Sequence, residues 1–114
     1  MADQRFPRAA RLLAKRDFDA AFEAASRFRS AHFRVNVRAT GAPARLGLAI
    51  AKRVVALASA RNRIKRHARE VFRPLRAELA GHDIVVSVHA SPVALDGAAL
   101  KRELETLFRR SVAR

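Results

Sequence analysis

The residues able to do chemistry concentrate in one short stretch of the chain. Residues 60–70 read ARNRIKRHARE, and the longer segment from Lys52 to Arg76 holds nine Lys/Arg and a single acid, Glu70. A solvated helix face usually mixes both signs, because like charges one turn apart destabilise a helix by about 0.2–0.5 kcal/mol per pair. The pattern therefore predicts binding to a polyanion, and the alternative is a solvated face that happens to be cationic.

The charge of the whole chain points the same way. Lys and Arg number 24 against 10 Asp and Glu, a net charge of +14 in 114 residues. Nucleic acid is the first candidate partner, and an anionic membrane surface is the second. The membrane alternative needs an exposed apolar helix face or a lipidation site, whereas the apolar stripes of this chain are needed for its core. Twenty of the cations are Arg, which suits bidentate phosphate contact, although codon bias explains that ratio equally well.

Catalytic and metal-binding patterns are missing from the sequence. The chain has no Cys, its four His show no HxxxH or HExxH spacing, and its four Gly are isolated. Asp17, Asp19 and Asp96 occupy expected first turns of helices, where the helix dipole is a sufficient explanation for them. The sequence therefore predicts no catalytic residue, no bound metal and no cofactor held by the protein itself.

These residues need elements to position them, and the length favours one domain over residues 1–114 with an irregular segment at 1–14. Apolar periodicity predicts helices over 15–25, from Ser59 to a kink or end near Arg73, where Pro74 follows, and over 97–111. Alternation predicts strands at 32–39, 45–51 and 82–90, the first two paired as a hairpin, with a further short strand at Val54 and Val55.

The predicted fold class is α+β: a single-domain α/β sandwich with three helices and a central, mostly antiparallel sheet of about four strands in the order αβββαβα. No apolar run approaches the roughly 18 residues of a membrane span, so we expect a cytoplasmic protein with no membrane association.

Aromatic residues offer a second possible contact with nucleic acid. Phe18 and Phe22 lie four residues apart on one helix face, which suits either core packing or stacking on bases. The strand at 32–39 places Arg34, Asn36 and Arg38 on one face of the sheet. Together these groups could hold single-stranded RNA by stacking and phosphate contacts, and the sequence leaves this choice open.

The segment RNRIKRHAREVFR, residues 61–73, closely resembles the hallmark segment of the bacterial ribonuclease P protein family. The resemblance extends over most of the chain. FPRAARLL, DFDAAF, RLGLAIAKR, DIVVSVHA and the terminal LFRR occur in the order typical of that family.

The resemblance implies a cytoplasmic, RNA-binding partner of a catalytic RNA, acting in tRNA 5′-leader removal. In such a ribonucleoprotein the RNA subunit and its Mg²⁺ ions, held mainly by RNA, cleave the leader from precursor tRNA. The protein is then an accessory subunit of an endonuclease, a hydrolase in which it supplies no catalytic side chain, and no obligate protein partner is expected. The resemblance also implies a left-handed βαβ crossover, which spacing would not suggest.

Site residues follow from the matching positions. The resemblance implies that the RNA subunit is bound by Arg61, Asn62, Arg63, Lys65, Arg66, Arg69 and Arg73. It implies that a cleft for the 5′ leader is formed by Arg11, Phe18, Phe22, Arg34, Asn36, Lys52 and Arg53. Many family members carry an aromatic residue where Asn36 stands, so this departure bears on leader affinity more than on subunit assembly.

Two rival functions remain. A general RNA-binding protein of ribosomal or chaperone type would share the basic composition, but it gives no reason for the RNR spacing. A free-standing nuclease would cleave without added RNA, and it lacks the acid, base or metal cluster that such chemistry needs.

Overall fold

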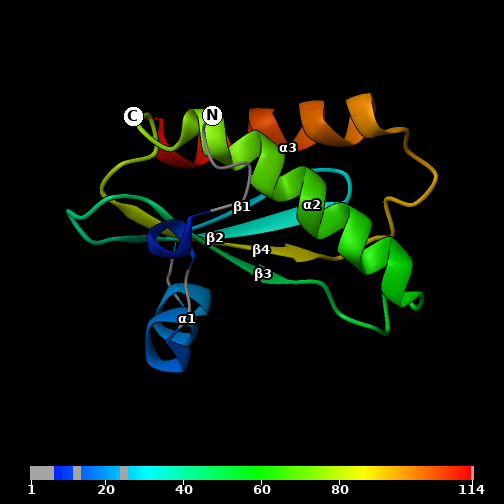
Figure 1. Ribbon diagram of the computed structural model, residues 1–114, viewed down its shortest axis with the longest axis horizontal. Helices are drawn as coiled ribbons and strands as arrows, with labels where there is room; N and C mark the ends of the chain where they lie inside the picture. Colours follow the sequence, from blue (N-terminus) through cyan, green and yellow to red (C-terminus); the bar gives the residue numbers. More distant parts are fainter. Residues whose placement is uncertain (1–6, 12–13, 24–25, 114) are drawn as a thin grey trace.

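The computed structural model describes residues 7–11, 14–23 and 26–113. The elements, labelled in Figure 1, are a 3₁₀ turn η1 (Arg8–Ala10), α1 (Lys15–Phe22), β1 (Ser26–Arg29), β2 (Phe33–Ala39), β3 (Arg45–Ala49), α2 (Ala58–Leu75), β4 (His82–Val88) and α3 (Gly97–Val112). This order confirms the predicted αβββαβα arrangement. Asp96 caps α3 as its position suggests, because its side chain accepts a hydrogen bond from the amide of Ala99 at 2.8 Å.

The sheet has the strand order β1-β2-β4-β3. The β1/β2 and β2/β4 pairs are antiparallel and the β3/β4 pair is parallel, so the sheet is mostly antiparallel as predicted. The predicted hairpin between β2 and β3 is wrong, because β4 lies between these strands. The turn that joins β2 to β3 is held by Gly81 instead: the amides of Thr40 and Gly41 donate to its carbonyl, and its own amide donates to the carbonyl of Ala42.

A second correction concerns the short strands. Val54 and Val55 form no strand, because their amides both donate to the carbonyl of Ala51 in a turn. The fourth strand of the sheet is instead β1, which the sequence analysis did not predict. Its sequence SRFR has one apolar residue and therefore little alternation to detect. The basic helix continues two residues past Arg73, with Pro74 inside its last turn.

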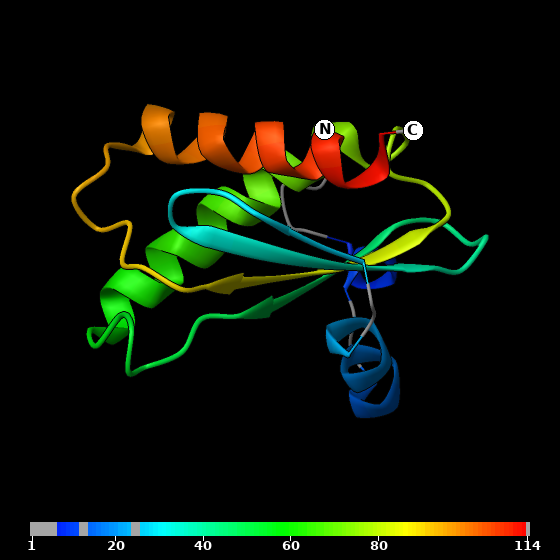
Figure 2. The same cartoon turned by 180° about the vertical axis from the view of Figure 1, so that it is seen from behind.

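Helices α2 and α3 cover one face of the sheet and α1 lies against the other, as Figures 1 and 2 show from opposite sides. Helix α2 connects the parallel strands β3 and β4 across the face that α3 also covers. Seen from that face with both strands pointing up, β4 lies to the left of β3, so the crossover is left-handed, against the usual preference for right-handed connections.

The main core lies between the sheet and the α2/α3 layer. Phe33, Ile64, Phe72 and Phe108 are fully buried there, and the rings of Phe72 and Phe108 meet edge to face with centroids 5.8 Å apart. A small second cluster lies under α1, where Ala21 packs with Val85, Phe18 and Ala49. The α1 face of the sheet is therefore only partly covered. None of the helices in the described ranges is both long and apolar enough to span a membrane.

Candidate nucleic-acid interface

A cationic stripe runs along α2. Ile64 and Ala68 are buried in the core, so the helical period turns the cations at 65, 66, 69 and 73 away from it, with the exposed Asn62 on the same side. Arg66 is exposed, whereas Arg69 is half-buried. Burial, together with the charge of Arg11, lowers the pKa of Arg69 below its ordinary value. Arg11 therefore lies close to this stripe.

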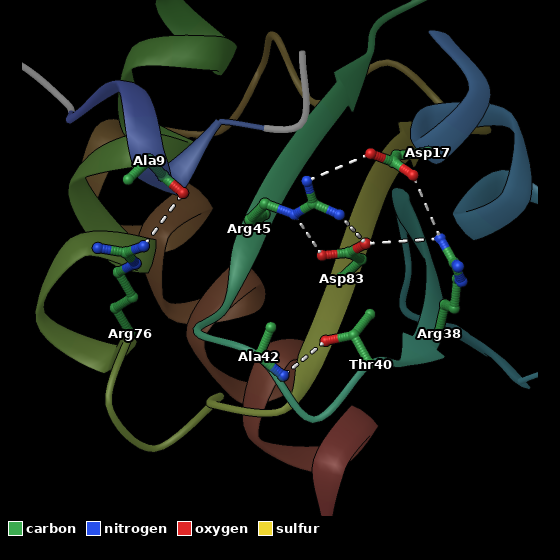
Figure 3. A network of polar contacts seen from close by, with 8 residues as sticks. All are labelled: Ala9, Asp17, Arg38, Thr40, Ala42, Arg45, Arg76 and Asp83. Carbon is green, nitrogen blue, oxygen red and sulfur yellow. Dashed lines mark hydrogen bonds and ion pairs between the residues drawn. The ribbon is translucent and has the colours of Figure 1, made fainter. Parts of the chain in front are cut away.

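Contacts of the segment from Arg8 to Arg11 with β3 and with the end of α2 position Arg11 beside this stripe. It forms an isolated parallel bridge with Leu46 of β3. Arg76, directly after α2, ties the same segment to this helix, because its guanidinium donates to the carbonyl of Ala9 at 3.1 Å (Figure 3). It also donates to the carbonyl of Ala44 at 3.0 Å. The structure thus places Arg11 beside α2, although the resemblance assigned it to the leader cleft.

Both arginines of the RNR segment donate hydrogen bonds to backbone carbonyls of neighbouring loops. Arg61 donates from Nη1 to the carbonyls of Val55 at 3.0 Å and Ala56 at 2.8 Å. Arg63 donates from Nη2 to the carbonyl of Leu95 at 3.3 Å. These contacts fix the segment before α2 and the loop before α3. Both residues consequently have a structural task in addition to any contact with RNA.

A groove of about 560 Å³ opens on the α1 side of the sheet. It brings together three residues of the expected leader cleft, Phe22, Arg34 and Arg53, with Lys65 of the α2 stripe. Its lining does not include Lys52, which is exposed. The remaining lining residues are Leu48, Ala49, Ile50, Ala51, Ser87, Val88 and His89.

Sequence reasoning missed the polar groups that β4 contributes to this groove. Ser87 is the one polar residue in the run IVVSV, and its position on the α1 face follows from strand alternation. His89 lies just beyond the strand, and its Nε2 donates to the carbonyl of Ser30 at 2.9 Å. The interruption of an apolar strand by Ser87 was the available signal.

The two phenylalanines of α1 have different surroundings. Their rings stack with centroids 6.3 Å apart and an interplanar angle of 22°. Phe18 packs against the small cluster of Ala21 and Val85, whereas Phe22 is 42% exposed and lines the groove. Phe18 thus supports the ring of Phe22, which is open to a ligand.

Asn36 lies beneath α1. Only 3% of the residue is exposed, and its Nδ2 donates to the carbonyl of Phe22 at 2.6 Å. Its Oδ1 is buried without a hydrogen-bond partner. Asn36 therefore positions the end of α1, whereas the resemblance placed it among the residues in contact with the leader.

A charge network closes the opposite end of this sheet face (Figure 3). Asp83, fully buried, accepts from Nε and Nη2 of Arg45 at 2.9 and 2.7 Å. Asp17 of α1 lies 3.4 Å from Nη1 of Arg45, and Arg38 lies 3.8 Å from both carboxylates. Two Arg and two Asp leave this end electrically neutral, and the network ties the first turn of α1 to the sheet.

The arrangement is suited to binding. Within the part of the chain that the structure describes, no three His, Cys, Asp or Glu side chains gather as a metal site would require. The groove instead combines an open aromatic ring with cations, the combination that binds single-stranded nucleic acid by stacking and phosphate contact.

Comparison with known proteins agrees with this geometry. A family model described as Ribonuclease P matches residues 6–112. The ribonuclease P protein component of Halorhodospira halophila is 46% identical over 110 residues, covering 94% of this chain and 89% of the relative. The corresponding protein of Burkholderia pseudomallei is 42% identical over 125 residues, covering 99% and 92%.

Solved structures show the same fold. The RNase P protein from Thermotoga maritima in complex with 1-(4-fluorophenyl)-2-thiourea has a TM-score of 0.78 at 29% identity, covering 88% of this chain and 98% of that one. The Staphylococcus aureus RNase P protein has a TM-score of 0.81 at 22% identity, covering 90% and 95%, and supports the fold alone.

Proposed function

Since the chain belongs to the ribonuclease P protein family, we propose a separate binding role in the holoenzyme for each of two surfaces, the α2 stripe and the groove beside α1. As the protein component it is an accessory subunit of the endoribonuclease that matures tRNA 5′ ends, and its partner is the RNA subunit. In our proposal the α2 stripe binds that RNA, and the groove beside α1 receives the 5′ leader of precursor tRNA.

The observation that carries this proposal is the position of Lys65. It belongs to the α2 stripe and also lines the groove that contains Phe22. A leader strand in the groove would therefore lie next to the RNA bound along α2. This contiguity would hold the junction of leader and tRNA close to the RNA subunit, where the chemistry takes place.

The protein's own contribution is binding and charge neutralisation. Cations that contact phosphates release counterions, which makes the affinity depend on salt and reduces the need for other cations. We therefore propose that Mg²⁺ is held mainly by the RNA, and that the protein lowers the Mg²⁺ concentration at which the holoenzyme works.

The direct experiment measures cleavage of a 5′-extended precursor tRNA at low Mg²⁺. Three reactions are compared: bacterial ribonuclease P RNA alone, the protein alone, and the two together. We expect cleavage at the mature 5′ end only in the mixture. Tight RNA binding without stimulation would favour a general RNA-binding protein, and cleavage by the protein alone would indicate a nuclease.

A second experiment tests the groove. Phe22→Ala removes the exposed ring and should weaken holoenzyme binding of precursor tRNA by about 1–3 kcal/mol, the usual contribution of a base stacked on an aromatic side chain. Binding of mature tRNA should not change, because it has no leader. Val93→Ala is the matched control, since Val93 is also exposed but lies outside the groove. Equal weakening for both tRNAs would argue against a leader in the groove.

A further inference from the structure

Two arginines face each other across the edge of the sheet. In the β1/β2 ladder Arg29 pairs with Arg34, and the neighbouring pair is Phe28 with Val35. Phe28 and Val35 belong to the core on the α2/α3 side. Because side chains alternate along a strand, Arg29 and Arg34 both project from the α1 face.

This pair has no compensating acid. Like charges directly opposite each other destabilise a sheet, and neither side chain forms an ion pair with a carboxylate within the described residues. On the same face, Asp17 and Asp83 lie at the other end, where they are matched by Arg38 and Arg45.

The acid nearest to the hairpin turn is also engaged elsewhere. Glu103 of α3 accepts hydrogen bonds from Ser30 and from the backbone and ring of His32. These contacts tie the turn to the α3 layer, on the face opposite the two arginines. Among the described residues, no ion pair with an acid therefore compensates the positive charge of Arg29 and Arg34 at the β1 end of the groove.

The local backbone holds the pair in place. The guanidinium of Arg110 on α3 donates to the carbonyl of Arg29, which joins the edge strand to the helix layer. Arg34 lies in the lining of the groove that contains Phe22, and its strand partner Arg29 extends this surface to the outer edge of the sheet. The two guanidinium groups are thus presented from paired backbones, an arrangement that suits a phosphate between them.

We propose that Arg29 and Arg34 together bind the phosphodiester backbone of the 5′ leader, at nucleotides farther from the cleavage site than the one stacked on Phe22. This inference rests on the proposed leader groove. Its consequence is that affinity increases with leader length until the strand reaches the edge of the sheet at β1.

The test uses the holoenzyme and precursor tRNAs with a short leader of about four nucleotides and a long one of about twelve, which span the usual site sizes for single strands. The variant is R29Q/R34Q, which removes both charges and keeps side chains of similar length. Arg102→Gln is the matched control, because Arg102 is an exposed arginine of α3 outside the groove. Dissociation constants are measured over a range of salt concentrations.

We expect R29Q/R34Q to weaken binding of the long-leader precursor by roughly three- to tenfold and to lower its salt slope by about 0.7 for each lost phosphate contact. Short-leader precursor, mature tRNA and the RNA subunit should bind as before. The melting temperature of the free variant should not fall, because the substitution relieves repulsion between the strands.

Other outcomes overturn the proposal in distinguishable ways. Weaker binding of the RNA subunit would assign the pair to phosphates of that subunit. An equal loss for both leader lengths would place the contact near the tRNA body. If the unmodified holoenzyme itself does not distinguish precursor from mature tRNA, the leader groove is wrong, and the failure does not concern this pair alone.

Discussion

Asn36 joins the sheet to the exposed aromatic ring of the groove, because its Nδ2 donates a 2.6 Å hydrogen bond to the carbonyl of Phe22. This carbonyl lies at the last residue of α1, where no further turn of helix can satisfy it. The direction in which α1 ends, and with it the position of the Phe22 ring, therefore depends on a buried side chain of β2.

Replacing Asn36 by Ala should separate this positioning from stability. The carbonyl of Phe22 loses its partner, but the unpaired Oδ1 of Asn36 disappears as well, so the free energy of unfolding should fall by only about 1 kcal/mol. Precursor tRNA should bind more weakly while mature tRNA is unaffected. Urea unfolding and the two dissociation constants provide the measurements. Unchanged precursor binding would make Asn36 a packing residue only.

The buried carboxylate of Asp83 should matter more than its partner on α1. Asp83→Asn disrupts a fully buried, two-point contact with Arg45 and should lower the free energy of unfolding by about 3 kcal/mol. Asp17→Asn is the matched control: its side chain is 27% exposed and lies 3.4 Å from Arg45, so it should cost at most about 1 kcal/mol. Similar losses for both would mean that the network acts as a single unit.

The helices could be predicted from the sequence because each buries a stripe of apolar residues, such as Ile64 and Ala68 in α2, that is visible in local periodicity. The pairing of the strands could not. β4 separates β2 from β3, although it begins more than thirty residues after β3, and this choice depends on contacts that no short window contains.

The same limit applies to the site. The residue types at Phe22, Arg34 and Lys65 indicated nucleic-acid binding, and the structure gathers them in one groove. The loop contacts of Arg61 and the buried position of Asn36 were not predictable, because their partners are backbone carbonyls whose positions depend on the folded chain.

Acid should loosen the attachment of the β1/β2 turn to α3. Burial raises the pKa of Glu103, but hydrogen bonds from Ser30 and His32 outweigh it and bring the pKa below its ordinary value. The folded state therefore keeps this charge at pH values where the unfolded chain takes up a proton. This contribution to stability is complete above the unfolded pKa of about 4.3 and is lost as the pH falls through the folded value.

Glu103→Gln should accordingly lessen the decline in the free energy of unfolding below about pH 5, measured by urea unfolding at a series of pH values. Glu70→Gln is the control. Hydrogen bonds from Lys101 and His67 lower the pKa of Glu70, against the opposing effect of its burial, but its side chain is 38% exposed whereas that of Glu103 is 15% exposed, so its substitution should have the smaller effect. A pH profile unchanged by Glu103→Gln would contradict the assignment.

The α2 stripe predicts different results for two arginines of the same segment. Arg66 is exposed and makes no hydrogen bond or ion pair with the described residues, so Arg66→Ala should lower the salt slope of RNA-subunit binding by about 0.7–0.9 and change the free energy of unfolding by less than about 0.5 kcal/mol. Arg61→Ala should also destabilise the protein, by about 1–2 kcal/mol, because the carbonyls of Val55 and Ala56 lose their donor. Salt-dependent binding and urea unfolding on both variants check this.

An unchanged salt slope for Arg66→Ala would remove this residue from the RNA-binding surface, and unchanged stability for Arg61→Ala would show that its loop contacts are dispensable.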